Sequence, residues 1–180
     1  MADLPWLLLD VDGTLCPLGS GGGEEMLESS GDYGEVRYAR AQPARLAALA
    51  EPFALIWATS WGHEANDVLS PLFGLPLLPV IEFGDVTFKM GETWKLPVIR
   101  RYVKEWPFAW VDDEIGKDAH RWAGKRSVPT LLLDVRPDVG LTQDHVDSLL
   151  RFAATVRGSG QASGTVDHVR HGVGDPPETA

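Results

Sequence analysis

The 180-residue sequence is short of the residues on which several classes of protein depend. It contains one cysteine, Cys16, so no internal disulfide can form, and this scarcity is typical of a reducing cytoplasm. Its apolar runs, such as the one that follows Trp6, are far too short to span a bilayer. The sequence contains no basic segment followed by a hydrophobic stretch, so we expect no signal peptide. We therefore expect a cytoplasmic protein with no membrane contact.

Positive charge is also scarce. The sequence has 16 Lys and Arg residues against 26 Asp and Glu residues, which gives a formal net charge of −10. A protein that holds duplex nucleic acid needs many cationic contacts to phosphates, so this balance argues against duplex binding, although a small local basic site is compatible with it.

Apolar runs alternate with helical patterns along most of the chain. The expected strands cover residues 7–11, 53–60, 78–83, 108–113 and 130–135. The expected helices cover residues 43–50, 62–73, 94–106 and a segment that starts at Thr142. Continuous apolar strands separated by helices indicate a Rossmann-like three-layer α/β/α sandwich, with a central parallel sheet of about five strands. In such sheets, ligands bind at the carboxyl ends of the strands.

Two segments depart from this pattern. Residues 16–42 contain the run GSGGG and have room for a short flap or insertion. This run is not a phosphate-binding P-loop, because no Gly-Lys-Ser/Thr follows it. Residues 158–180 are rich in Gly, Ser and Pro, so we expect a poorly ordered tail after a single folded domain over residues 1–157.

Polar side chains stand where the expected strands end or helices begin. They are Asp10 and Asp12, Thr59 and Ser60, Lys95, and Asp112 and Asp113. Because the carboxyl ends of parallel strands share one edge of the sheet, these groups could converge on one cleft. At about 5 Å and an effective dielectric constant near 20, each pair of carboxylates repels by roughly 3 kcal/mol. A cation would relieve this repulsion, and ligands that are all oxygen suit Mg²⁺.

Each residue also has a plainer interpretation. An Asp at a strand end is usually a turn former, and Thr59 or Ser60 could cap the helix that follows. Lys95 is harder to explain in this way, because a cation at a helix N-terminus opposes the helix dipole and calls for an anion nearby. Lys89 is a competing candidate in the less regular stretch TFKMGE.

The order of DVDGTL, WATS, a helix-start lysine and WVDDE resembles the haloacid dehalogenase (HAD) superfamily of phosphohydrolases, over about residues 5–156. More narrowly, WATSW, TWKLP and WVDDE are similar to the HAD domain of Swiss Army Knife RNA repair proteins. The resemblance implies a HAD-like fold and a phosphatase that works through an aspartyl-phosphate. It identifies Asp10 as the nucleophile and Asp12 as the general acid and base.

The resemblance also implies roles for the other polar residues. Thr59 would bind the phosphoryl group, and Lys95 would neutralise its charge. The expected Mg²⁺ ligands are Asp10, Asp12 (through its backbone carbonyl), Asp112 and Asp113. We expect Gly13 and Ser60 to join Thr59 and Lys95 in binding the phosphorylated substrate.

HAD enzymes often carry a cap domain, but residues 16–42 and 84–93 leave room only for a flap or a small hairpin. A nearly capless cleft is open to large substrates, or it relies on a partner subunit as a lid, as in a homodimer. Two alternatives stay open: a nucleotidase or polynucleotide-end phosphatase, and an inactive module that binds phosphate or a partner. Trp61 and Trp94 could stack on a base, whereas Glu24 and Glu25 would disfavour a polyanion.

Overall fold

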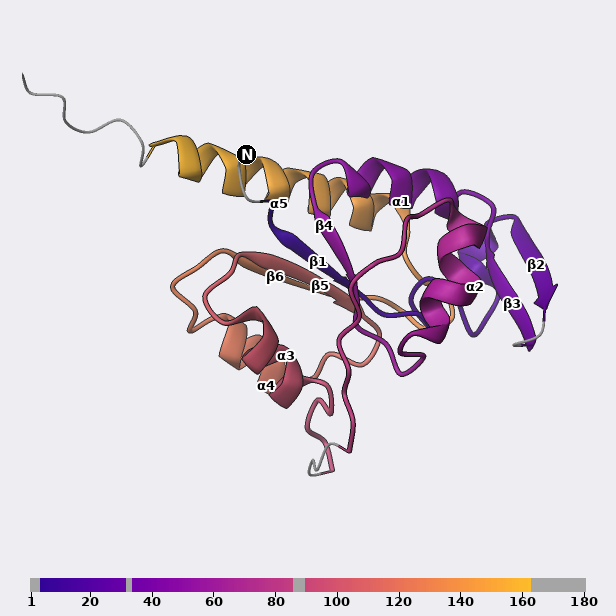
Figure 1. The fold of residues 1–180 in the computed structure, drawn as a ribbon, viewed down its shortest axis with the longest axis horizontal. Helices are drawn as coiled ribbons and strands as arrows, with labels where there is room; N and C mark the ends of the chain where they lie inside the picture. The colour runs from indigo at the N-terminus through magenta and orange to yellow at the C-terminus, as the bar shows by residue number, and fades with distance from the viewer. Residues whose placement is uncertain (1–3, 32–33, 86–89, 163–180) are drawn as a thin grey trace, which may run out of the picture.

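The computed structural model describes residues 4–31, 34–85 and 90–162. Its centre is a parallel sheet in the order β4-β1-β5-β6 (Figure 1). The strands are β1 (Trp6–Leu9), β4 (Ala54–Trp57), β5 (Phe108–Asp112) and β6 (Thr130–Asp134). From β1 the chain first adds β4 on one side and then returns to add β5 on the other. The ends of β1 and β5 therefore lie at the point where ligands bind in such sheets.

Helices cover both faces of this sheet (Figure 1). One face carries α1 (Gln42–Ala50), α2 (Glu64–Phe73) and α5 (Gln143–Ala162), and the other carries α3 (Leu96–Val103) and α4 (Lys117–Ala123). Successive residues of β1 divide between the two faces, as the period of a strand requires. Leu7 and Leu9 belong to the first hydrophobic cluster, and Leu8 belongs to the second. The expected Rossmann-like α/β sandwich is thus confirmed.

The prediction of a strand over residues 78–83 is wrong, because the parallel sheet formed by the described residues has four strands and this segment is not one of them. This segment runs beside β4 but forms a single parallel bridge, between Trp57 and Val80. Pro79 has no N–H to extend the ladder. Asn66 of α2 also captures the backbone of Leu78, since its amide donates to the Leu78 carbonyl and accepts from the Leu78 N–H, both at 2.8 Å.

The helices also differ from expectation at their ends. Helix α3 is shorter than the expected 94–106, since Lys104 leaves the helical conformation with φ 43°. Helix α4 was not expected, because it has seven residues and one buried apolar side chain, Ala119, which is too few to show a period. Helix α5 runs to Ala162, past the expected end of the domain at residue 157; the rest of the tail lies outside the described residues. No helix in the described segments is long and apolar enough to cross a membrane.

The expected flap contains a two-stranded antiparallel hairpin, formed by β2 (Met26–Gly31) and β3 (Gly34–Ala39) after a short 3₁₀ turn, η1 (Gly21–Gly23). The hairpin lies beside α2 (Figure 1). Tyr38 packs edge-on against Phe73 of α2, with ring centroids 5.3 Å apart. Val36 and Tyr38 are buried in the main core, so the hairpin is anchored on the domain.

Candidate active site

A buried lysine joins the ends of the two central strands. Asp10 follows β1 directly, Asp112 is the last residue of β5, and the two are 4% and 0% exposed. Lys95 lies at the start of α3 and is itself 3% exposed. Its Nζ donates to Asp10 Oδ1 at 2.6 Å and to Asp112 Oδ2 at 2.7 Å. The anion that a helix-start lysine calls for is therefore present twice.

Asp112 is fixed by further donors. The indole Nε1 of Trp110 donates to Asp112 Oδ2 at 3.1 Å, and the Glu114 N–H donates to Oδ1 at 2.9 Å. A buried carboxylate needs such partners to remain charged without a large cost. Trp110 is fully buried in the core, and its indole N–H also orients a carboxylate.

Asp113 brings a third carboxylate to the same place. Oxygen atoms of Asp10, Asp112 and Asp113 lie within 4.8 Å of one another. Gly13 makes this approach possible: its φ is +71°, and a Cβ at this position would collide with the Asp113 carboxylate. The N–H of Gly13 donates to the Cys16 carbonyl at 2.9 Å, within the turn after Asp12. Its predicted role in substrate binding stays a prediction.

One lysine does not balance three carboxylates. Burial, and then the charge of Asp112, raises the pKa of Asp10 to about 7 although Lys95 opposes the shift. The same two causes raise the pKa of Asp113. Burial alone would lower the pKa of Lys95, but the charges of Asp112 and Asp10 outweigh it and raise that pKa. The cluster therefore favours an additional positive charge.

These residues fit a divalent cation. The donor set consists of carboxylate oxygens from two adjacent strand ends, which is the chemistry of Mg²⁺ sites. A cation among them would offset the repulsion that raises the pKa of Asp10. Asp10, Asp112 and Asp113 are the side chains that would hold it.

Asp12 points elsewhere. Its carboxylate is exposed, lies outside the three-carboxylate cluster and accepts from Trp61 Nε1 at 2.9 Å. Trp61 also donates its backbone N–H to Thr59 Oγ1 at 3.3 Å. Thr59 is 1% exposed, and within the described segments no acceptor takes its hydroxyl proton. Trp61 thus links the expected acid to the expected phosphoryl ligand, a contact that no periodicity in the sequence reveals.

A hollow of about 440 Å³ adjoins Thr59. Ser60, exposed beside Thr59, lines it, and Phe83 and Trp94 form an aromatic wall with ring centroids 5.0 Å apart. The buried hydroxyl of Thr14, inside the motif DVDGTL, donates to Asp10 Oδ2 at 3.3 Å. The hollow gives space for the leaving part of a substrate.

A hydrogen-bonded bridge fixes the loops that carry Lys95 and Asp113. Thr93 donates its N–H and its hydroxyl to Asp118, at 3.1 and 2.7 Å, and its Oγ1 accepts from the Gly116 N–H at 2.8 Å. The bridge joins segments more than 20 residues apart, so no local pattern could reveal it. Lys89, the competing lysine, lies outside the described residues.

Comparison with known proteins supplies one match. The family model described as the HAD domain in Swiss Army Knife RNA repair proteins matches residues 6–146, which include every site residue named above. Among curated proteins, none matches the sequence.

Proposed function

The chain belongs to the family of HAD domains found in Swiss Army Knife RNA repair proteins, and from this membership and its site we propose that it is a Mg²⁺-dependent phosphatase. The observation that carries the proposal is the position of Lys95 between Asp10 and Asp112. A buried carboxylate held by a cation at the ligand-binding edge of the sheet is suited to attack phosphorus. The substrate class is a phosphate monoester.

In the first step, a carboxylate oxygen of Asp10 forms a bond to phosphorus as the bond to the leaving oxygen breaks. Asp12, at the rim of the cleft, gives its proton to that oxygen. The hydroxyl of Thr59 donates to a phosphoryl oxygen, and Lys95 offsets the negative charge that collects on the phosphoryl group.

In the second step, water attacks the aspartyl-phosphate. Asp12 takes the proton of this water, the oxygen–phosphorus bond to Asp10 breaks, and inorganic phosphate leaves. Asp10 and Asp12 thereby return to their starting states. The indole N–H of Trp61 donates to the Asp12 carboxylate and would hold it beside the cleft between the two steps.

Asp10, Asp112 and Asp113 would hold Mg²⁺, together with the backbone carbonyl of Asp12. When bound, the ion supplies positive charge that shields the phosphate from the carboxylates. The excess of carboxylates over cations at this point is the feature of the chain that favours it.

A second candidate is that the phosphate is carried by the end of an RNA strand. The description of the family names RNA repair proteins. The aromatic wall beside Thr59 is compatible with a nucleotide as the leaving part.

The first test is phosphate release from an aryl phosphate, with and without Mg²⁺, by the wild type and by Asp10→Asn. We expect metal-dependent release that falls by at least about 10³-fold in the variant. A module that merely binds phosphate would release none, and its phosphate binding would survive Asp10→Asn. Equal release by both proteins would contradict the covalent mechanism.

A further inference from the structure

Although the chain is acidic, half of its Lys and Arg residues lie in one segment. Eight of its 16 Lys and Arg residues fall between residues 95 and 126: Lys95, Arg100, Arg101, Lys104, Lys117, Arg121, Lys125 and Arg126. Apart from the buried Lys95, they lie on α3, on α4 or at the carboxyl ends of these helices. The helical face of α3 and α4 is therefore basic in a molecule with a net charge of −10.

Most of this charge is exposed and has no carboxylate partner. Six cations on this face are exposed, and none of them forms an ion pair with a described residue: Arg100, Arg101, Lys104, Lys117, Arg121 and Lys125. Elsewhere in the described chain, four arginines are paired: Arg37, Arg40, Arg45 and Arg136. Unpaired cations that cluster on one face attract a polyanion.

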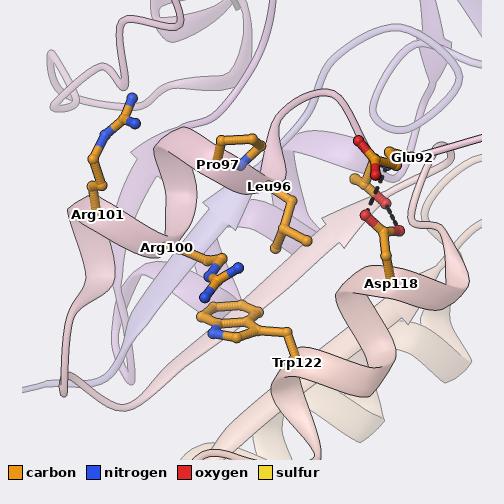
Figure 2. Close-up of a pocket in the computed structure, with 8 residues that line it drawn as sticks. Glu92, Leu96, Pro97, Arg100, Arg101, Asp118 and Trp122 are labelled. Atoms are coloured by element: carbon orange, nitrogen blue, oxygen red, sulfur yellow. Dashed lines mark hydrogen bonds between the residues drawn. The ribbon is translucent and has the colours of Figure 1, made fainter. Parts of the chain in front are cut away.

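A half-buried aromatic ring, that of Trp122, lies on this face. Figure 2 shows the guanidinium of Arg100 over the ring of Trp122, at 5.9 Å from the ring centroid, and Arg126 lies 5.0 Å from the same centroid. Arg100 and Trp122 line a groove of about 610 Å³ between α3 and α4. Guanidinium planes and indole rings are the surfaces on which unpaired bases stack.

The groove is not uniformly basic. Glu92 and Asp118 line the end nearer the catalytic edge, where Asp118 is engaged by Thr93 (Figure 2). On another side of α4, a hollow of about 520 Å³ is lined by Lys117, His120 and Arg121. Cations thus line both hollows, Arg100 and Arg101 of α3 in the groove and Lys117 and Arg121 of α4 in the second hollow, and a flexible chain of phosphates can contact both sets.

This face begins close to the catalytic lysine along the chain. Thr93, which lines the groove, is two residues from Lys95, and Arg100 is five residues further along the same helix. Five residues of helix span about 7.5 Å. A strand whose terminal phosphate lies at Asp10 would reach Arg100 within its first few nucleotides.

We propose that the face of α3 and α4 centred on Arg100 and Trp122 binds the backbone of a single-stranded polynucleotide, whose terminal phosphate enters the cleft. This inference rests on the proposed phosphatase function and specifies its substrate class. An acidic peptide would use the cations but not the stacked ring, so the Arg100–Trp122 pair favours a nucleic acid. The basic face is confined to two short helices, which suits a single strand better than a duplex.

The test compares oligonucleotides of one, two, four and eight nucleotides, phosphorylated at either end, with an aryl phosphate. We expect kcat/KM to rise at least tenfold between one and four nucleotides and then to level off. If the protein contacts three phosphates of the strand, kcat/KM for the oligonucleotide should fall about 20-fold between 50 and 200 mM salt, because counterions are released on binding. The aryl phosphate should show a much smaller loss.

Charge reversal locates the effect. In Arg100→Glu and Lys117→Glu, the ratio of kcat/KM for the longest oligonucleotide to that for the aryl phosphate should fall about tenfold, and the salt dependence should weaken. Arg151→Glu, an equal change of charge at an exposed position of α5 on the opposite face, is the matched control and should leave the ratio unchanged.

The outcomes separate the two proposals. Aryl phosphatase activity without dependence on oligonucleotide length would overturn this inference and leave the proposed function intact. If no substrate is hydrolysed, the proposed function fails, and fluorescence anisotropy with a labelled oligonucleotide and the Asp10→Asn protein tests the surface by itself. Binding that Arg100→Glu weakens would support the surface, and absence of binding would overturn it. A preference for acidic phosphopeptides over oligonucleotides would also overturn it.

Discussion

Two regions of the molecule bury a cation against carboxylates, and they differ in the balance of charge. Arg45 is 7% exposed and donates to both carboxylate oxygens of Glu24 and to the Leu141 carbonyl at 2.9 Å. Hydrogen bonds from Arg45 hold the pKa of Glu24 below its ordinary value, against the opposing effect of burial. At the cleft, one cation faces three carboxylates, and burial raises the pKa of Asp10 to about 7.

This difference shows how a ligand-binding site can be recognised from the imbalance of its buried charges. The charges of a balanced pair such as Arg45–Glu24, which joins the segment before β2 to α1, cancel without a further cation. The unbalanced cluster costs free energy in the folded protein until a ligand supplies positive charge. Four changes break or sharpen this comparison.

The largest effect is expected from Lys95→Met, which leaves Asp10, Asp112 and Asp113 without a cation. Breaking a buried pair in this way costs roughly 3–5 kcal/mol in the free energy of unfolding. Loss of the charge should also lower the turnover of an aryl phosphate by about 10²–10³-fold. Urea denaturation without Mg²⁺ and steady-state kinetics with Mg²⁺ measure the two effects. Lys104→Met, which removes an exposed cation, is the control and should change neither the stability nor the turnover of the aryl phosphate.

The second effect is that of the metal. Mg²⁺ at 100 times its dissociation constant should stabilise the fold by about 2.7 kcal/mol. For a chain of this size, this raises Tm by about 5–10 °C. Asp113→Asn should weaken the shift, because a ligand is lost. Asp12→Asn should retain it, since the Asp12 carboxylate lies outside the cluster. An equal shift in all three proteins would place the ion elsewhere.

The balanced pair should show a smaller effect. Arg45→Met leaves Glu24 without its partner and the Leu141 carbonyl without a donor, so we expect about 2 kcal/mol of destabilisation. Arg40→Met removes an ion pair with Glu25 in which both side chains are at least 60% exposed, and Tm should not change measurably. Neither variant should alter the Tm shift with Mg²⁺, and a change in that shift would contradict the separation of the two regions.

The sequence predicted the cleft better than the balanced pair. Asp10, Asp112 and Lys95 could be placed because buried strands end in acids and a helix begins with a cation, which are local patterns. The pair of Arg45 and Glu24 spans 21 residues across a hairpin and has no local pattern. The expectation that Glu24 and Glu25 repel a polyanion assumed free carboxylates, whereas each is bound to an arginine.

The errors in the predicted fold have the same origin, namely contacts that leave no local pattern in the sequence. The side chain of Asn66 occupies the backbone N–H and carbonyl of Leu78, and α4 is held by the bridge from Thr93 to Asp118. Neither contact follows from periodicity. The basic face of α3 and α4 was missed for a similar reason, because the net charge of the chain does not show where its charged residues lie.

The last prediction concerns no change of stability or turnover but the reactivity of Cys16, a buried thiol near the carboxylates of Asp12 and Asp10. Burial, and then the charges of Asp12 and Asp10, raises the pKa of the Cys16 thiol to about 12. The thiolate, which is the reactive form, should therefore be rare even at pH 9, and rise only as the pH approaches 12. We expect alkylation by iodoacetamide at pH 9 to be at least about 100-fold slower in the native protein than in urea. Rapid alkylation of the native protein would show that this side of the cleft is open to solvent, and that the negative charge of the cleft does not extend to Cys16.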